Sequence, residues 1–413
     1  MFLNSLYEHN IDKKIMKVLI VHNYYRNHGG EETSVSNKIK LLKENGIEVK
    51  TFSRNNSNIK NIYHKILIFF SSIFSFRSAK AFKKTITDFK PDIIEVHNTF
   101  PMISPSIFFT AKKLNIPLIY YLHNFRNICG SSIISSKNKC CKKCNGNFFL
   151  AIKNQCYRKS YLGSLSLATN NFIHKNILKT WKKQVDTFVI MNKNNLNYFT
   201  EFGINSNKIH LLPHFTFMNS SRMLKKKNYA LFVGEFSRNK GFHTLIKAFN
   251  EIDYQLKIIG QVKNKDEELK KLNINLNKVG FINKKRNIEN IGFVENNQLS
   301  KYYAEANFTI FPSEAEETFG YVIIESFANF TPVLSSNQKS LKKIVKNEYN
   351  GLLFKSGDHL DLKNKIEWLV RNTSFTKNMS FNAKKDFDNN YSSKIHFSAL
   401  MSLYKKAISL QTK

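Results

Sequence analysis

Acidic residues are scarce in this 413-residue chain, because 30 Asp and Glu stand against 64 Lys and Arg and give a formal net charge of +34. Such a surface favours anionic partners: phosphorylated ligands, anionic lipid headgroups or nucleic acid. An equal alternative is that the excess of Lys reflects genomic drift toward A/T-rich codons, which places Lys at solvent-exposed positions without a function. Arginine is scarce too, at nine of the 64 cations. Nucleic-acid binding favours Arg and clustered charge, whereas Lys is spread along this whole chain, so we expect no nucleic-acid partner.

Long apolar runs are also missing. The longest covers 65–76 (KILIFFSSIFSF) and falls short of the roughly 20 residues that span a bilayer. The first fifteen residues are polar, so we expect no secretory signal there, and Met16 is a candidate start. These absences predict a cytoplasmic protein, or one that is peripheral on the inner face of the cell membrane.

Cysteine is confined to one stretch, 129–156, which holds all five. A cytosolic location argues against disulfides. A Cys-x2-Cys knuckle with two flanking thiols suits tetrahedral zinc. We leave three states open, namely structural zinc, reduced thiols without metal, and disulfides. The candidate ligands are Cys129, Cys141, Cys144 and Cys156, with Cys140 to spare.

Near-continuous apolar strands alternate with helical patterns, which indicates a doubly wound parallel sheet. A polar, aperiodic stretch at 216–228 reads as a domain linker, and the alternation then restarts. We therefore predict two α/β domains, 16–215 and 229–385, and a C-terminal helical segment, 386–413. The strand patterns lie at 16–25, 46–53, 91–98, 116–124, 185–192, 208–215, 229–236, 254–261, 290–297, 307–314 and 331–336.

The last helical pattern covers 392–409, with Ser392 or Ser393 as its expected N-cap. Its apolar face is predicted to comprise Ile395, Leu400, Leu403, Tyr404 and Ala407.

Two glutamates bracket a mostly apolar stretch, EETFGYVIIESFANFTPVLSS at 316–336. The preceding strand ends at Pro312, so Glu317 falls on the following loop and Glu325 inside the next helix. Ligands of open parallel sheets lie at the carboxyl ends of strands, and the N–H groups at a helix start bind anions. A carboxylate deeper in the helix suits vicinal hydroxyls, such as those of a ribose. The structural alternative is an exposed Glu325 and a helix-start charge at Glu317.

The spacing Glu317-x7-Glu325, followed by Thr-Pro-Val, resembles the signature of glycosyltransferase family 4, which comprises retaining enzymes of the GT-B fold. HGGEE (28–32) resembles the family's Gly-Gly loop, and 233–249 resembles its phosphate-binding segment. HNTFPMISPS and YLHNFRNICG look like a subfamily of surface-polysaccharide synthesis. The likeness covers most of the chain. It implies two Rossmann-like domains that face a cleft, with the last helix crossing back to the N-terminal domain.

The resemblance also implies roles for individual residues. Glu317 would bind hydroxyls of the donor sugar, and Glu325 would bind the ribose. His123, at a strand end, would lie near the transferred sugar; the alternative is that it only hydrogen-bonds backbone. Lys240 would hold the diphosphate. The full implied donor set is Gly29, Gly30, Arg238, Lys240, Val294, Phe319, Gly320, Tyr321 and Glu325.

Two residues depart from the family pattern. Glu235 stands where Arg is usual, so either its carboxylate turns away, or Arg238 supplies the charge, or diphosphate binding is weaker. Phe330 replaces a Gly before Thr-Pro-Val, which we expect to alter packing below the site.

Asp386 and Asp388 match the letters of a metal-binding Asp-x-Asp, but we place them between helical segments and interpret the match as coincidence.

Residues 59–84 mix aromatic and basic side chains without an acidic one, as an interfacial amphipathic element does. An ordinary helix covering the sheet is the equal alternative.

The combined prediction is a retaining glycosyltransferase that needs no cofactor and uses a nucleotide-sugar donor, most simply UDP-linked. Its acceptor would be a glycan or a polyprenyl-linked glycan. The competing hypotheses are a sugar-nucleotide epimerase or phosphorylase of the same fold, and a non-catalytic basic binding protein on a decayed scaffold.

Overall fold

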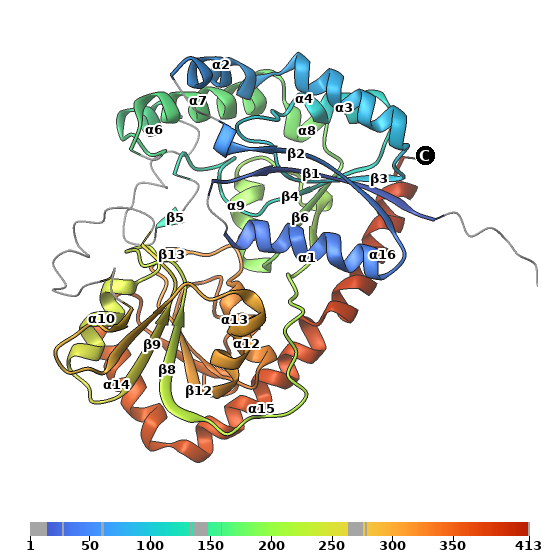
Figure 1. Ribbon diagram of the computed structural model, residues 1–413. Helices are drawn as coiled ribbons and strands as arrows, with labels where there is room; N and C mark the ends of the chain where they lie inside the picture. The colour runs from blue at the N-terminus through green and yellow to red at the C-terminus, as the bar shows by residue number, and fades with distance from the viewer. Residues whose placement is uncertain are drawn as a thin grey trace, which may run out of the picture.

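The computed structural model describes residues 15–26, 29–58, 62–131, 134–135, 148–157, 159–262, 276 and 279–411. Within these residues the chain builds two sheets, each flanked by helices on both faces (Figure 1). The predicted two-domain parallel architecture of the GT-B type is confirmed.

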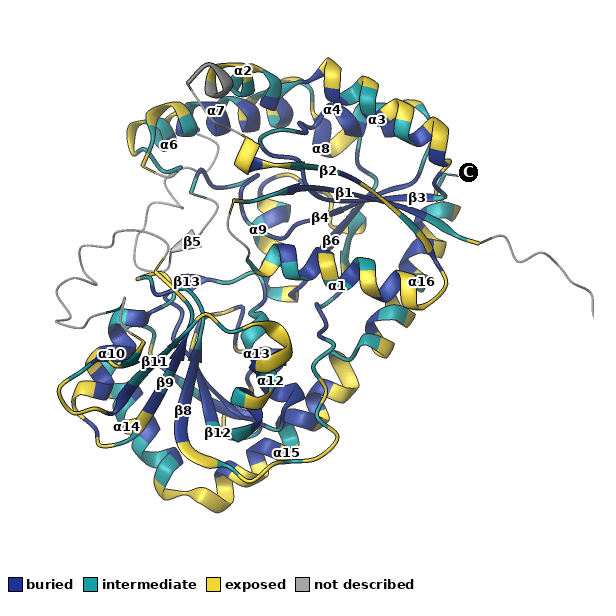
Figure 2. Ribbon diagram, viewed as in Figure 1, coloured by how far each residue is buried: buried dark blue, intermediate teal, exposed yellow. Residues whose placement is uncertain are grey.

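The first sheet has the strand order β2-β1-β3-β4-β6-β7, and all its pairs are parallel. Its inner strands β1, β3, β4 and β6 are buried on both faces because helices cover both sides of the sheet (Figure 2). The edge strand β2 is largely exposed. The strands are β1 (Lys17–Tyr24), β2 (Glu48–Asn55), β3 (Ile93–Asn98), β4 (Leu118–Tyr121), β6 (Thr187–Ile190) and β7 (Ile209–Leu211). The helices of this half are α1 (Gly30–Glu44), α2 (Ile62–Ile73), α3 (Phe76–Phe89), α4 (Ser106–Lys113), α6 (Phe149–Lys153), α7 (Tyr161–Phe172), α8 (Thr180–Lys183) and α9 (Leu196–Glu201).

The second sheet has the order β10-β11-β9-β8-β12-β14-β15, parallel except for the β10–β11 pair. Its strands are β8 (Lys227–Val233), β9 (Gln255–Ile259), β10 (Gly280–Phe281), β11 (Ile288–Gly292), β12 (Ala306–Phe311), β14 (Val333–Ser336) and β15 (Gly351–Phe354). Its helices are α10 (Phe242–Asn250), α12 (Asn296–Glu305), α13 (Tyr321–Ala328), α14 (His359–Arg371) and α15 (Thr373–Asn390).

Each sheet has one topological switch point, where the chain leaves a strand toward one side and later returns on the other. In the first sheet this point lies between β1 and β3, and in the second between β8 and β12. The crevice outside the carboxyl ends of the strands at such a point is where open α/β sheets bind ligands. The topology alone therefore marks two places to look for ligands.

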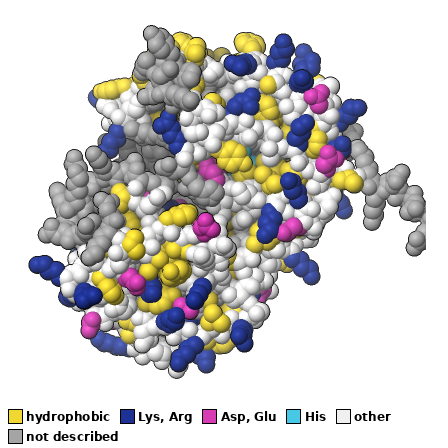
Figure 3. All heavy atoms as spheres, in the orientation of Figure 1, with side chains coloured by type: hydrophobic (Ala, Val, Ile, Leu, Met, Phe, Trp, Pro, Cys, Tyr) yellow, Lys and Arg dark blue, Asp and Glu magenta, His cyan; other side chains and the backbone are white. Residues whose placement is uncertain are grey.

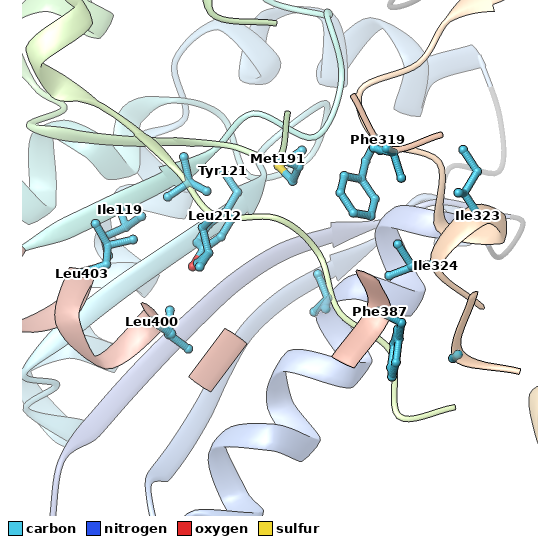
Figure 4. Packing of buried hydrophobic residues seen from close by; sticks show 14 of the residues in the cluster. Ile119, Tyr121, Met191, Leu212, Phe319, Ile323, Ile324, Phe387, Leu400 and Leu403 are labelled. Atoms are coloured by element: carbon cyan, nitrogen blue, oxygen red, sulfur yellow. The ribbon is translucent and has the colours of Figure 1, made fainter. Parts of the chain in front are cut away.

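The last helix, α16 (Ser393–Ser409), crosses back to the first domain, as predicted (Figure 1). Leu400, Leu403 and Tyr404 share a buried apolar cluster with residues of α1 and with Phe319 and Phe387 of the second half (Figure 4). Ser392 is the N-cap residue, as predicted, but its side chain makes no capping hydrogen bond, because its Oγ donates to the Asp388 carbonyl at 3.2 Å. The prediction of Ile395 on the buried face was wrong, since Ile395 is 43% exposed.

Of the basic aromatic segment at 59–84, the described residues form parts of two helices, α2 and α3, rather than one element. Helix α2 ends at Ile73, and Ser75 accepts a hydrogen bond from the Ser78 amide as the N-cap of α3. A hydrogen bond between Ser72 and Ser166 (3.1 Å) fastens the end of α2 to α7. No helix among the described residues has both the length and the apolar character needed to span a bilayer.

Candidate active site in the interdomain cleft

A cleft of about 420 Å³ lies between the two domains, within the range of about 300–1,000 Å³ that is usual for small-molecule sites. The second domain lines it at the switch point, with Glu235 after β8 and Glu317 after β12. The first domain contributes Gly29, Gly30 and Glu31 at the start of α1 and two histidines from strand ends, His123 and His214.

The loop after β12 takes part in a half-buried ion pair. Glu317 accepts hydrogen bonds from Lys240 Nζ at 2.7 Å and from Ser313 Oγ at 2.6 Å. Lys240 is held at the start of α10 by Gly241, whose φ of +68° brings it against Pro312; a Cβ there would lie 1.8 Å from the Pro312 carbonyl oxygen. The two residues implied to bind sugar and diphosphate are thus in direct contact, and Lys240 is partly neutralised.

The start of α13 presents backbone to the cleft. Gly320 is its N-cap with φ +103°, and a Cβ there would lie 3.1 Å from Ile323 Cδ1. Across the cleft Tyr321 stacks on His214 with ring centroids 4.6 Å apart, and an added Cβ on Gly30 would be 3.7 Å from its ring. The two domains therefore meet at Tyr321, and α13 begins at the cleft wall, where N–H groups at a helix start can bind an anion.

Glu325 lies behind the cleft lining, one turn into α13, and is buried. Tyr303 donates a hydrogen bond to its Oε2 at 2.9 Å. Burial raises the pKa of Glu325 to about 7, and the Tyr303 hydrogen bond opposes that rise only in part. The alternative of an exposed Glu325 is therefore wrong.

A row of stacked rings runs inward from the cleft. His123 stacks on His214 at 5.4 Å and on His97 at 5.0 Å, and His97 Nδ1 lies 2.7 Å from His123 Nε2. On its other side His97 Nε2 is 3.3 Å from a carboxylate oxygen of Glu95. Besides its ring contacts, His123 accepts a hydrogen bond at its carbonyl from Thr318 Oγ1 at 2.8 Å. This bond joins the strand end of the first domain to the loop after β12 in the second domain.

These contacts fix the tautomers of the ring pair. Burial alone would raise the pKa of Glu95, but Lys38, His97 and Tyr121 outweigh it and hold the pKa at about 2. The carboxylate only accepts, so His97 Nε2 carries a proton and donates it. Burial lowers the pKa of His97 and of His123, which keeps both rings neutral. His97 Nδ1 then accepts from His123 Nε2–H, and Nδ1 is the acceptor of the His123 ring.

A buried cation balances Glu95. Lys38 Nζ of α1 lies 3.8 Å from Glu95 Oε1 and 2.9 Å from His396 Nε2 of α16. Tyr121 donates to Glu95 Oε1 at 2.5 Å, and His396 Nδ1 is 2.7 Å from the Pro213 carbonyl, to which it donates. The C-terminal helix therefore docks onto the same polar cluster that orients His97.

A second polar cluster lies at the mouth of the first domain. Tyr25 donates to Glu31 Oε2 at 3.0 Å and accepts from Arg126, and Asn124 donates to the same oxygen at 3.1 Å. Arg126 donates to Asn98 Oδ1 at 2.7 Å. Burial raises the pKa of Glu31 despite the nearby Arg126 and His22.

Of the residues implied by the resemblance, the cleft brings together Gly29, Gly30, His123, Lys240, Val294, Glu317, Phe319, Gly320 and Tyr321. Glu325 lies just behind them. Arg238 is exposed and does not line the cleft, whereas Glu235 does. Glu235 is therefore part of the cleft wall, and Arg238, which does not line the cleft, is not placed to replace the missing cation there. The described lining residues include more acidic than basic side chains, namely Glu31, Glu235 and Glu317 against Lys240.

Phe330 affects the backbone as well as the packing. Its φ is +54°, in the left-handed region where a Gly is unstrained and a bulky residue is rare. Its ring meets Phe381 at 6.1 Å and the Lys384 ammonium at 5.6 Å.

The Asp-x-Asp letters fall inside helix α15, so their placement between helices was wrong. Asp386 accepts from Lys346 at 3.0 Å and Asn350 at 2.7 Å, and Asp388 accepts from Lys384 at 2.5 Å. Both carboxylates are engaged by side chains of the second domain.

The cysteine-rich insert pairs with the loop after β12. Strand β5 (Ile134–Ser135) pairs antiparallel with β13 (Ala315–Glu316), directly before Glu317. Of the predicted zinc ligands, Cys141 and Cys144 lie outside the described residues. Cys156 lies beside Gly130, the chain neighbour of Cys129, since a Cβ on Gly130 would be 3.5 Å from Cys156 Cβ. The zinc site stays a prediction.

Comparison with known proteins gives the class and then the family. Among solved structures, a sucrose-phosphate synthase from Thermosynechococcus elongatus superposes with a TM-score of 0.67 at 17% identity, covering 96% of this chain and 100% of the other. Anabaena HepE in complex with UDP-glucose gives 0.64 at 15% identity, covering 94% and 100%. These likenesses establish the fold as GT-B.

Family models settle the family. "Glycosyltransferase Family 4" matches residues 28–216, and "Glycosyl transferases group 1" matches 215–386. The chain belongs to the glycosyltransferases of the family 4 type.

Three curated relatives add context. An uncharacterized glycosyltransferase of Methanocaldococcus jannaschii is 28% identical over 90% of this chain and 93% of its own length. The capsular polysaccharide biosynthesis glycosyltransferase CapM of Staphylococcus aureus is 27% identical over 50% of this chain and 51% of its own. A Campylobacter jejuni α-1,4-N-acetyl-D-galactosaminyltransferase, named for a PP-undecaprenol-linked glycan, is 25% identical over 44% and 49%.

Proposed function

We propose that this glycosyltransferase moves a sugar from a nucleotide-sugar donor, most simply a UDP-sugar, to a glycan or polyprenyl-linked glycan in surface-polysaccharide synthesis. The observation that carries the proposal is the convergence of Lys240, Glu317 and the start of α13 on one cleft wall. The capsular and undecaprenol-linked substrates named for the relatives support the choice of pathway and acceptor.

The donor would lie along the carboxyl edge of the second sheet. Its ribose hydroxyls would meet Glu325, its base would face Val294, and its diphosphate would meet Lys240 and the first amides of α13. Backbone N–H groups at a helix start stabilise the negative charge that builds on the leaving phosphate. This stabilisation needs no metal ion. Because carboxylates outnumber cations on this wall, we expect these amides to supply much of the phosphate binding.

We infer a retaining, front-face reaction. The bond from the anomeric carbon to the phosphate oxygen breaks, and the acceptor hydroxyl forms a new bond to that carbon on the same face. The hydroxyl proton passes to the departing diphosphate. Glu317 and the His123 ring would hold the sugar hydroxyls. His123 Nδ1 would accept a hydrogen bond from a hydroxyl, because the ring proton is on Nε2.

We also propose peripheral attachment to an anionic membrane through α2 and α3. Ile66, Leu67, Phe70 and Phe76 are exposed, at 48%, 66%, 65% and 79%. The exposed Arg77, Lys80, Lys83 and Lys84 lie on the adjoining helix. Apolar groups beside cations suit a lipid headgroup boundary. Elsewhere, Figure 3 shows Lys and Arg spread over the visible face of both domains rather than gathered in one patch.

The test is a calorimetric titration of the purified chain with UDP, GDP and ADP, repeated with Glu325→Ala. We expect saturable binding of one nucleotide class that the substitution weakens. Failure of all three nucleotides to bind would contradict the proposal and favour a decayed, non-catalytic scaffold.

A further inference from the structure

The donor cleft occupies the switch point of the second sheet, and the switch point of the first sheet holds a second cavity. It has a volume of about 560 Å³. Arg26 follows β1, Asn56 follows β2 and Phe100 follows β3, so the cavity lies outside the carboxyl ends of these strands. This is the position where an open α/β sheet binds ligands.

The walls of this cavity are mostly apolar. Helix α2 contributes Ile66, Phe69 and Phe70, and helix α7 contributes Leu162 and Leu165. Ile66, Phe70 and Leu162 remain 48%, 65% and 56% exposed. Each is an apolar side chain whose removal from water is favourable in free energy. The two helices are held together by Ser72 and Ser166, so the walls are fixed against each other.

One end of the cavity is polar and cationic. Arg26 is the charged residue among the described lining residues, and its Nε donates to the Asn56 carbonyl at 3.2 Å. Apolar walls with a single guanidinium at one end fit an amphiphile that has an anionic head and a hydrocarbon tail.

The cationic end lies next to the donor cleft. Tyr25, the neighbour of Arg26, donates to Glu31 of the cleft. The Arg126 guanidinium lies 5.5 Å from the Tyr25 ring and 5.5 Å from the Phe100 ring of the cavity wall. One layer of side chains therefore separates the two spaces. A ligand with its tail between α2 and α7 would have its head near the place where the sugar is transferred.

We propose that this cavity binds the prenyl chain of a polyprenyl diphosphate-linked acceptor, with the diphosphate at Arg26. The inference rests on the proposed function and specifies its acceptor. The cavity would position the acceptor by its lipid, so a water-soluble glycan without that chain would bind more weakly.

The probe is farnesyl diphosphate, titrated into the full chain by calorimetry, with inorganic diphosphate as the head-only control. We expect saturable binding of farnesyl diphosphate that UDP does not displace, and much weaker binding of inorganic diphosphate. Ile66→Asp places a charge on the cavity wall, and Leu165→Trp fills the cavity. Each should weaken farnesyl diphosphate about tenfold or more, since each disrupts apolar burial of the chain.

Leu67→Asp is the matched control, because Leu67 lies on α2, is 66% exposed, and does not line the cavity. Equal weakening by Leu67→Asp would overturn the pocket in favour of surface adsorption. Absence of farnesyl diphosphate binding, or its displacement by UDP, would also overturn it. A change of oligomeric state in Ile66→Asp during sedimentation would assign the face to a second copy instead. UDP affinity is measured in the Asp variants as well. If it is unchanged, a loss of farnesyl diphosphate binding comes from the cavity and not from failure of the donor site.

Discussion

His97 Nδ1 lies 2.7 Å from His123 Nε2, and this contact orients the histidine at the cleft wall. Behind it, Glu95 holds the proton of His97 on Nε2, so the orientation of His123 depends on a strand residue that does not line the cleft.

His97→Ala removes that support. We expect kcat to fall on the order of 10²-fold, because a displacement of about 1 Å at a reacting group costs this much. UDP affinity should change little, since His97 does not line the cleft. His97→Gln, which can donate to Glu95 and accept from His123, should recover part of the rate. Equal rates for wild type and His97→Ala would contradict the positioning role.

Glu325 makes stability depend on pH in a defined direction. Its folded-state pKa of about 7 lies above the ordinary 4.5, so ionisation costs the folded state free energy. The cost is absent below about pH 4.5 and complete above about pH 7. Glu325→Gln should therefore raise the free energy of unfolding by on the order of 3 kcal/mol at pH 8.5 and by almost nothing at pH 4.5.

Urea unfolding at the two pH values measures this difference. Glu201→Gln, at an exposed position on α9, controls for the change in net charge. A gain that is the same at both pH values would show that ionisation of Glu325 is not its cause.

Glu235 should weaken the site that it lines. Replacing it by Gln removes a negative charge from the cleft wall, and replacing it by Arg adds a cation near the expected diphosphate. We expect Glu235→Arg to bind UDP most tightly, Glu235→Gln less tightly and the wild type least tightly. The differences in UDP affinity should shrink at high salt. Calorimetry in low and high salt tests the order, and Glu201→Gln is again the control. Weaker UDP binding in Glu235→Arg would mean that the carboxylate holds another group of the donor.

Gly320→Ala should damage the donor site through the backbone. The φ of +103° is unfavourable for Ala, and the new methyl group would meet Ile323 at 3.1 Å. We expect a loss of about 1–2 kcal/mol in stability and weaker UDP binding. Gly46→Ala shares a positive φ of +73° but has open space around it and lies outside the cleft, so it should lose stability and keep UDP affinity. Equal UDP affinity in both variants would contradict the backbone contact.

The sequence predicted most strands of the two sheets and one side of the cleft, but it missed the short edge strands β10 and β15 of the second sheet. Parallel strands buried on both faces read as apolar runs, and residues just after such runs, like Glu317 and Lys240, must meet at the carboxyl edge. Contacts across the chain were missed. His214 stacks on His123 although 91 positions separate them, and Tyr303 reaches Glu325 from another helix. A local signal did exist for Glu95 and His97, because a carboxylate in the apolar run IIEVHN needs buried partners.

Acceptor-dependent turnover tests the central claim most directly. A UDP-sugar is incubated with the enzyme, with and without a polyprenyl diphosphate-linked glycan, and both UDP release and the anomeric configuration of the product are measured. The account predicts UDP release that requires the acceptor and a product that keeps the configuration of the donor. An inverted product would contradict the retaining mechanism. Release of free sugar at the same rate without acceptor would contradict the assignment as a transferase.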